Sequence, residues 1–318
     1  MRWLLAILAL ALGATVASAA DYPCPQIRII VPYPPGGSND LAARIVAERL
    51  EASLKRTVLV ESRPGATGNI GTLAVVHSKP DGCTLLVNGA VIATFPMSFV
   101  RLGYDPLRDL VPIGGIGVSP TVIVTGGTSD VSDVSQLVER SAQRPGGLTY
   151  STAGYGLLQH LAVEEIALRT GARFVHVAYK GGPQSAADLI AGRLDFGSLS
   201  AGSVVPLIES GQLKPTAVIA NKRTMLAPNV PTIVEQGLAP LDAGVLYLLF
   251  APGGTPGDIV TFLSGELMKI IGDPAVQARL MRGGFEPAPI GSMDGAGIMR
   301  ATAQMWAPLI ARLKIALE

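Results

Sequence analysis

A proline- and glycine-rich turn at residues 31–40 separates two segments of different periodicity and constrains the fold of this 318-residue chain more than any other stretch. Residues 27–31 form a short apolar run that is typical of a buried strand, and the turn that follows continues neither helix nor strand. Apolar residues then recur at helical spacing over residues 38–54, and Ser38 is the expected N-cap. Strand, glycine turn and helix start together predict unpaired backbone N–H groups at the end of a strand.

Such N–H groups can hold a small anion without a cationic side chain, because they lie at the positive end of a helix dipole. The same arrangement also serves as an ordinary chain reversal in any α/β protein. Asp40 lies in the first turn and would repel an anion there. We therefore expect Asp40 either to point away or to bind a donor group or a water.

The first 20 residues are typical of a secretory signal peptide. A positive start precedes a short apolar core, which ends in small residues with A-x-A spacing. The apolar run is too short to span a bilayer. The sequence thus predicts an exported protein that begins near Ala20 or Asp21.

Charge and length limit the function classes that the exported part can belong to. Once Arg2 is removed with the signal peptide, 24 Lys and Arg residues balance 24 Asp and Glu residues. This balance gives no reason to expect nucleic acid or an anionic membrane surface as a partner. About 300 residues are long for one core, so we expect two domains.

The two cysteines, Cys24 and Cys83, each stand just before an apolar, strand-like run. If those runs are parallel neighbours, both cysteines lie at one edge of a sheet within bridging distance. An oxidising compartment then favours a disulfide, with two unrelated thiols as the alternative. No metal is expected, because the three histidines are scattered and the spacing matches no zinc ligand set.

Alternating strands and helices predict an α/β fold with two domains. Residues 27–87 read as βαβαβ, which implies a parallel sheet with a ligand crevice at the carboxyl ends of its strands. A second alternating series covers residues 131–219, and the run 245–250 carries the chain back. We expect domain 1 at 21–122 and 245–318, and domain 2 at 123–244. The helical tail should pack on domain 1, with Trp306 as a core anchor.

Motifs along nearly the whole exported chain carry a family resemblance. They include Tyr-Pro-Pro-Gly-Gly-Ser-Asn-Asp at 33–40, Arg-Pro-Gly at 63–65, Gly-Asn-Ile-Gly at 68–71, Pro-Asp-Gly at 80–82 and Ala-Pro-Gly-Gly-Thr-Pro at 251–256. In this order they closely resemble the Bug-type extracytoplasmic solute receptors of tripartite tricarboxylate transporters. The resemblance implies a type II periplasmic-binding-protein-like fold, whose two domains close on one ligand.

The resemblance also implies how the ligand is held. A small carboxylate is expected to bind through backbone N–H groups, small hydroxyls and ordered water, and a large and a small membrane subunit are the expected partners of a monomeric receptor. The implied site residues are Tyr33, Pro35, Gly37, Ser38, Asp40, Thr67, Gly68, Asn69, Ser151, Thr152, Ala153, Gly154, His160, Tyr179 and Leu199. No cofactor is expected. A lone helical histidine such as His160 is more often a packing residue than a ligand contact.

One departure from the family pattern bears on the ligand. Counting from Gly192, Leu199-Ser200 stands where the family usually has Asp-Asn. The missing aspartate would receive an amino group or a water, so its loss argues against an amino-acid ligand and favours a simpler or more apolar acid.

Other function classes have weaker support. An exported hydrolase would use Ser38 or Ser151 with His160, but no Gly-x-Ser-x-Gly elbow occurs. A nucleotide-binding enzyme lacks both the Gly-x-Gly-x-x-Gly and the Walker patterns. A receptor that feeds a signalling system instead of a permease stays open at this point.

Overall fold

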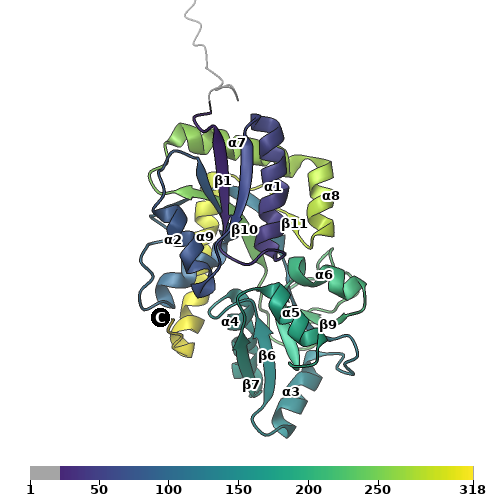
Figure 1. The fold of residues 1–318 in the computed structure, drawn as a ribbon. Helices are drawn as coiled ribbons and strands as arrows, with labels where there is room; N and C mark the ends of the chain where they lie inside the picture. The colour runs from purple at the N-terminus through teal and green to yellow at the C-terminus, as the bar shows by residue number, and fades with distance from the viewer. Residues whose placement is uncertain (1–21, 318) are drawn as a thin grey trace, which may run out of the picture.

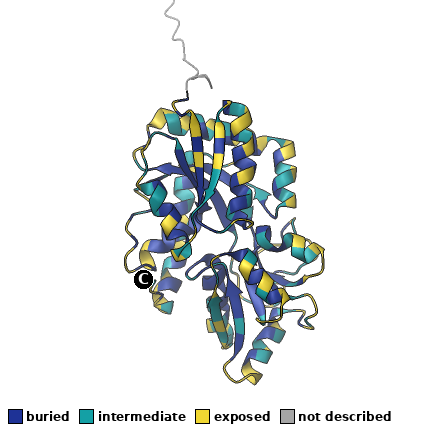
Figure 2. Cartoon of the chain, in the orientation of Figure 1, coloured by how far each residue is buried: buried dark blue, intermediate teal, exposed yellow. Residues whose placement is uncertain are grey.

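The computed structural model describes residues 22–317, which form two mixed β-sheets covered by helices (Figure 1). The expected signal peptide, residues 1–20, lies outside the described residues. Within 22–317 no helix combines the length and apolar character needed to cross a membrane. Figure 2 shows both sheets as mainly buried and the outer faces of the helices as exposed.

The first sheet has six strands in the order β11-β4-β10-β3-β1-β2. These strands are β1 (Gln26–Val31), β2 (Thr57–Ser62), β3 (Thr84–Gly89), β4 (Leu110–Ser119), β10 (Val245–Pro252) and β11 (Glu286–Pro287). The first three are parallel, as the βαβαβ pattern predicts, whereas β10 runs antiparallel between β3 and β4. We call this sheet and its helices the first lobe.

Helices from both ends of the chain cover the first sheet. They are α1 (Ser38–Leu54), η2 (Ala66–Gly68), α2 (Asn69–Val76), η3 (Ala90–Met97), α7 (Gly257–Gly272), α8 (Pro274–Arg282) and α9 (Ser292–Leu313). The tail packs on this lobe as predicted, because α7 and α9 contact β4. Trp306 is 3% exposed and belongs to the main core.

The second sheet has five strands in the order β7-β6-β8-β5-β9 and forms the second lobe with four helices. Its strands are β5 (Thr121–Gly126), β6 (Leu148–Thr152), β7 (Phe174–Ala178), β8 (Phe196–Ser200) and β9 (Leu213–Val218). Its helices are α3 (Val134–Gln143), α4 (Leu158–Thr170), α5 (Gly182–Ile190) and α6 (Ala201–Glu209). The chain enters this lobe at Pro120 and leaves it before β10. The exact domain boundaries stay a prediction.

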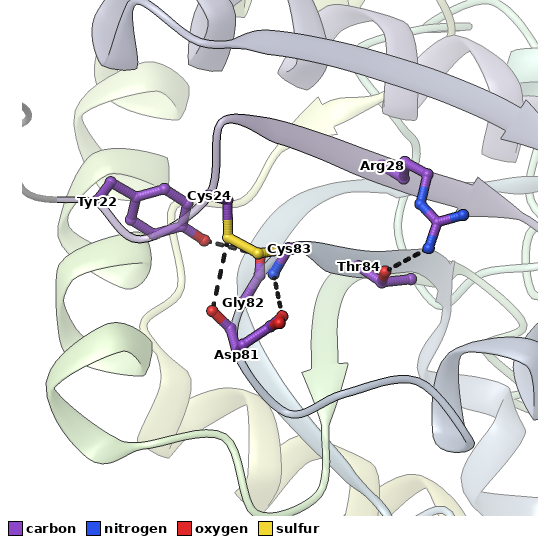
Figure 3. Close-up of a disulfide and its surroundings, with 7 residues drawn as sticks. All are labelled: Tyr22, Cys24, Arg28, Asp81, Gly82, Cys83 and Thr84. Atoms are coloured by element: carbon purple, nitrogen blue, oxygen red, sulfur yellow. Dashed lines mark hydrogen bonds between the residues drawn. A yellow bond between two sulfur atoms is a disulfide. The ribbon is translucent and has the colours of Figure 1, made fainter.

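The expected disulfide is confirmed (Figure 3). Cys24 and Cys83 are bonded, with Cα atoms 5.4 Å apart. They lie just before β1 and β3, which are parallel neighbours in the first sheet. The backbone N–H of Cys83 donates to Asp81, and the Tyr22 hydroxyl donates to the Gly82 carbonyl at 2.7 Å. The bridge therefore fixes the start of the chain to the turn that leads into β3.

Candidate functional site

A narrow cavity lies between the two lobes. The space inside it that the centres of water molecules can occupy is about 40 Å³. Its lining carries no acidic or basic side chain. The lining residues are Tyr33, Pro34, Gly37, Ser38, Asn39, Asn88, Gly89, Val91, Ala153, Leu157, Gln159, Gly181, Gly182, Pro183, Ser200, Ser203, Val245 and Tyr247. Any ligand held here must be bound by neutral groups.

Four helices begin at this cavity, and none of them has a side-chain cap. Their N-cap positions are Gly37 for α1, Leu157 for α4, Gly181 for α5 and Ser200 for α6. By contrast, aspartates cap α3 and α8, which begin away from the cavity. An uncapped start leaves N–H donors unpaired at the positive end of the helix dipole.

The start of α6 differs from the others because its first N–H groups are already used. Ala201 N–H donates to the Pro120 carbonyl at 2.8 Å, and Gly202 N–H donates to Ser119 Oγ at 3.0 Å. Helix α6 therefore offers hydroxyls, those of Ser200 and Ser203, rather than backbone donors. The starts of α1, α4 and α5 are the ones that keep unpaired backbone donors at the cavity.

Ser38 is not the N-cap that the sequence predicts. Gly37 occupies that position with extended φ and ψ of −87° and 175°, and Ser38 is the first helical residue. The Ser38 hydroxyl oxygen lies 3.1 Å from Ser203 Oγ of the second lobe. The prediction failed because glycine adopts the cap conformation, which frees the serine for a contact across the cavity.

Asp40 binds donors within its own turn, one of the two outcomes expected for it. Its carboxylate accepts the Gly36 N–H at 3.0 Å and forms an ion pair with Arg44 at 2.9 Å. The side chain is buried and does not line the cavity. Asp40 thus stiffens the turn, and Arg44 offsets its charge.

The segment 67–69 lies behind Tyr33 rather than on the cavity wall. The Tyr33 hydroxyl donates to the Thr67 carbonyl at 3.0 Å. Gly68 has φ of +89°, and a Cβ there would lie 3.0 Å from the Tyr33 hydroxyl oxygen. Asn69 donates to the Leu102 carbonyl instead of facing the cavity. Thr67 and Gly68 therefore support the tyrosine ring that lines the site.

In the second lobe, only Ala153 of the predicted turn 151–154 lines the cavity. Ser151 and Thr152 are fully buried, and their hydroxyls lie 2.6 Å from Ser185 Oγ and 2.7 Å from His176 Nε2. A Cβ at Gly154 would lie 3.0 Å from a methyl group of Thr67. Gly154 therefore marks a close contact between the lobes.

His160 is a packing residue. Its ring stacks on His176 with centroids 4.1 Å apart, and its Nδ1 accepts the Gly156 N–H at 3.1 Å. Burial, and next the charge of nearby His176, lowers the pKa of His160 to about 3, and burial lowers the pKa of His176 to about 4. Both rings are therefore neutral near pH 7.

Three other predicted residues also lie off the cavity wall. Pro35 is exposed on the turn, and the Tyr179 hydroxyl donates to Asp188. Leu199 is fully buried in a small core of the second lobe. Its neighbour Ser200 lines the cavity instead, because successive strand residues point to opposite faces.

The sequence analysis missed a polar network that crosses the cavity. Gln159 donates to Ser200 Oγ at 2.7 Å, and Ser200 Oγ lies 3.3 Å from the Tyr247 hydroxyl. All three side chains are at least nine-tenths buried. The sequence does contain one signal for this network, because Tyr247 is the only residue with a polar group in the apolar run 245–250.

The serines of the hydrolase alternative have no histidine partner in the described part of the chain. Ser38 pairs with Ser203, and Ser151 pairs with Ser185. The half-buried His176 bonds to Thr152, and the buried His160 bonds to the Gly156 backbone. Neither Ser38 nor Ser151 therefore has the general base that nucleophilic catalysis requires.

Known proteins of similar sequence and fold are receptors and binding proteins, which agrees with a cavity between two lobes. Residues 42–315 match the family model described as the tripartite tricarboxylate transporter family receptor. The protein BugT of Bordetella pertussis is 32% identical, over 93% of this chain and 92% of BugT. Two solved structures are also similar. The periplasmic binding protein BugD has a TM-score of 0.85 and 28% identity, over 91% of this chain and 98% of that one. An R. palustris protein with adipate has a TM-score of 0.87 and 29% identity, over 91% and 97%.

Proposed function

The chain belongs to the tripartite tricarboxylate transporter receptor family, and on that premise we propose that it captures a small carboxylate between its lobes and delivers it to a membrane transporter of that type. One observation supports the proposal above all. The cavity has no charged side chain in its lining, and α1 and α5 begin at it without side-chain caps. Oriented N–H groups of this kind bind carboxylates without a cation. A relative of similar fold contains adipate, a carboxylate.

The donor set is sufficient for useful affinity. Hydrogen bonds to a charged group contribute about 1.5–3 kcal/mol each when the site is desolvated. About three to five such bonds, reduced by the costs of ordering and desolvation, give micromolar affinity or better. The serine hydroxyls at 38, 200 and 203 supplement the backbone donors at the same cavity.

Ligand capture is coupled to closure of the lobes. The two bodies that close are the proposed domains, residues 21–122 with 245–318 against residues 123–244. A ligand shifts the open–closed balance only by its differential affinity for the two states. Groups from both lobes line the cavity, so a bound carboxylate favours the closed form.

The closed monomer is then recognised by the large and small membrane subunits of the transporter. This step takes place in the periplasm, the compartment named for BugD. Export there uses residues 1–20 as the signal peptide.

A calorimetric and thermal-shift screen of the purified protein without residues 1–20 tests the proposal. The panel contains C3 to C6 mono-, di- and tricarboxylates, aromatic acids and amino acids. A true ligand raises the melting temperature in proportion to its binding free energy. Ser38→Ala removes a cavity hydroxyl and should abolish or strongly reduce that rise. Ser210→Ala, at an exposed serine after α6, is the matched control.

Two results would contradict the proposal. One is the absence of binding for every carboxylate in the panel, and the other is tight binding that Ser38→Ala leaves unchanged. A crystal structure with the acid outside the interlobe cavity would reject the site directly.

A further inference from the structure

Three apolar side chains from three different elements line the cavity, and we call them its apolar wall. Leu157 is the N-cap residue of α4, where serine, threonine, aspartate or asparagine would ordinarily supply an oxygen. Its side chain is buried and lines the cavity together with Val91 and Val245. A Cβ placed on Gly89 would lie 2.8 Å from Val245 Cγ1 and 3.3 Å from Val91 Cγ1. The two valine side chains therefore converge over Gly89.

Two polar side chains that also line the cavity, Asn88 and Tyr33, already have hydrogen-bond partners. The Asn88 side-chain oxygen accepts the Gly89 N–H at 2.8 Å, and its amide nitrogen donates to Thr72 Oγ1 at 3.3 Å. The Tyr33 hydroxyl donates to the Thr67 carbonyl. A carboxylate placed against the wall would lose its hydration without gaining these donors, and such burial is strongly unfavourable.

We propose that the ligand carries a single carboxylate and an apolar body, with the body packed against Leu157, Val91 and Val245. This inference rests on the proposed function and narrows its substrate class. The carboxylate is held at the starts of α1 and α5, where the N–H groups are unpaired and Ser38 and Ser203 meet. Leu157 then determines specificity, because its apolar side chain lines the cavity and offers no hydrogen-bond donor to a second carboxylate.

Matched pairs of acids test the inference, since each pair has the same chain length and differs in one terminal carboxylate. Suitable pairs are butanoate with butanedioate and hexanoate with hexanedioate. Dissociation constants measured by calorimetry at pH 7.5 and constant ionic strength should favour the monocarboxylate by about tenfold or more in at least one pair. A tenfold ratio corresponds to about 1.4 kcal/mol.

A serine at the α4 N-cap should change this preference. Leu157→Ser removes apolar contact and places at the start of α4 a hydroxyl that can donate to a second carboxylate. We expect the ratio of the two dissociation constants to move toward the dicarboxylate by about tenfold. Leu168→Ser, at an exposed leucine of the same helix, controls for the loss of an α4 leucine away from the cavity. Val91→Thr adds a hydroxyl with little change in volume and should move the ratio in the same direction.

The outcomes separate the inference from the proposed function. If dicarboxylates bind as tightly as their monocarboxylate partners or more tightly, the inference is wrong while the receptor function stands. If the ratio does not move in Leu157→Ser and Val91→Thr, and circular dichroism shows both variants to be folded, the apolar wall does not select the ligand. If no acid of either kind binds, the proposed function itself fails.

Discussion

The hydroxyl oxygens of Ser38 and Ser203 lie 3.1 Å apart, although the two residues lie in the first turns of helices from different lobes. The contact joins α1 of the first lobe to α6 of the second at the edge of the cavity. Gly202 lies beside it, and a Cβ there would be 2.8 Å from Ser38 Oγ and 3.0 Å from the Phe285 ring. The close approach of the lobes at this point thus depends on the absence of a side chain at position 202.

Gly202→Ala should therefore favour the open form. The added methyl group meets Ser38 and Phe285 only when the lobes are together, so we expect ligand affinity to fall by about tenfold or more. Small-angle scattering with ligand present should give a larger radius of gyration than for the unmodified protein. Gly265→Ala, where an added Cβ meets nothing within 4 Å, should leave affinity unchanged. Full affinity in Gly202→Ala would show that this contact does not limit closure.

Gly68→Val should reduce affinity through Tyr33. The side chain must enter a site with φ of +89° and displace the Tyr33 ring, which lines the cavity. The left-handed backbone alone costs about 1–2 kcal/mol. Gly192→Val imposes a similar backbone cost at φ of +69°, but nothing lies within 4 Å of its Cβ. Equal affinity in the two variants, measured by calorimetry, would mean that Tyr33 is not part of the site.

Reduction of the Cys24–Cys83 disulfide should lower stability. The bridge joins positions 59 residues apart, and loss of a closed loop of this length corresponds to about 4 kcal/mol in the chain-entropy model. Thermal melting with and without reductant should show a clear fall in melting temperature. The Cys24→Ala/Cys83→Ala double variant should melt at the lower temperature under both conditions. Two reactive thiols in the unreduced, denatured protein would contradict the bond.

Stability should also fall in mild acid because of His160 and His176. Their folded pKa values, about 3 and about 4, lie below the unfolded value near 6.5, so the unfolded chain binds protons first. Their contribution is complete above pH 6.5 and is lost as the pH falls toward 4. Between pH 7 and pH 5 the loss is roughly 2 kcal/mol per histidine.

Denaturant unfolding at several pH values measures this dependence. His176→Gln should flatten the slope between pH 7 and pH 5, whereas His77→Gln, at an exposed position, should leave it unchanged. An identical slope in His176→Gln and the unmodified protein would show that His176 is not a source of the pH dependence.

The order of strands and helices was predictable because each element carries its own local signal. Apolar runs, helical periodicity and glycine turns gave the alternation in both lobes, and adjacent parallel strands explain the cysteine pair. The site was less predictable, since it depends on which way single side chains point. Leu199 and Ser200 are neighbours on β8, yet only Ser200 faces the cavity. Sequence spacing cannot determine that register without knowledge of the facing element.

The hydroxyls of Ser151 and Thr152 illustrate a second limit. Both residues stand at the end of a strand, as a ligand-binding turn would require. Their partners, Ser185 and His176, lie 34 and 24 residues further along the chain. Whether a hydroxyl is free for a ligand depends on such distant partners, which local sequence does not reveal. Tyr247 reaches the cavity for a similar reason, because β10 returns from the second lobe.

The central place of β10 also sets an order of events during biogenesis. This strand fills the gap between β3 and β4, but it is made after the whole second lobe. The edges of β3 and β4 that pair with β10 therefore stay without their partner strand until more than 120 further residues have been synthesised or translocated. The lobe that contains the first strand of the chain is the last to be completed, and folding intermediates with those edges open are natural clients of a holding chaperone.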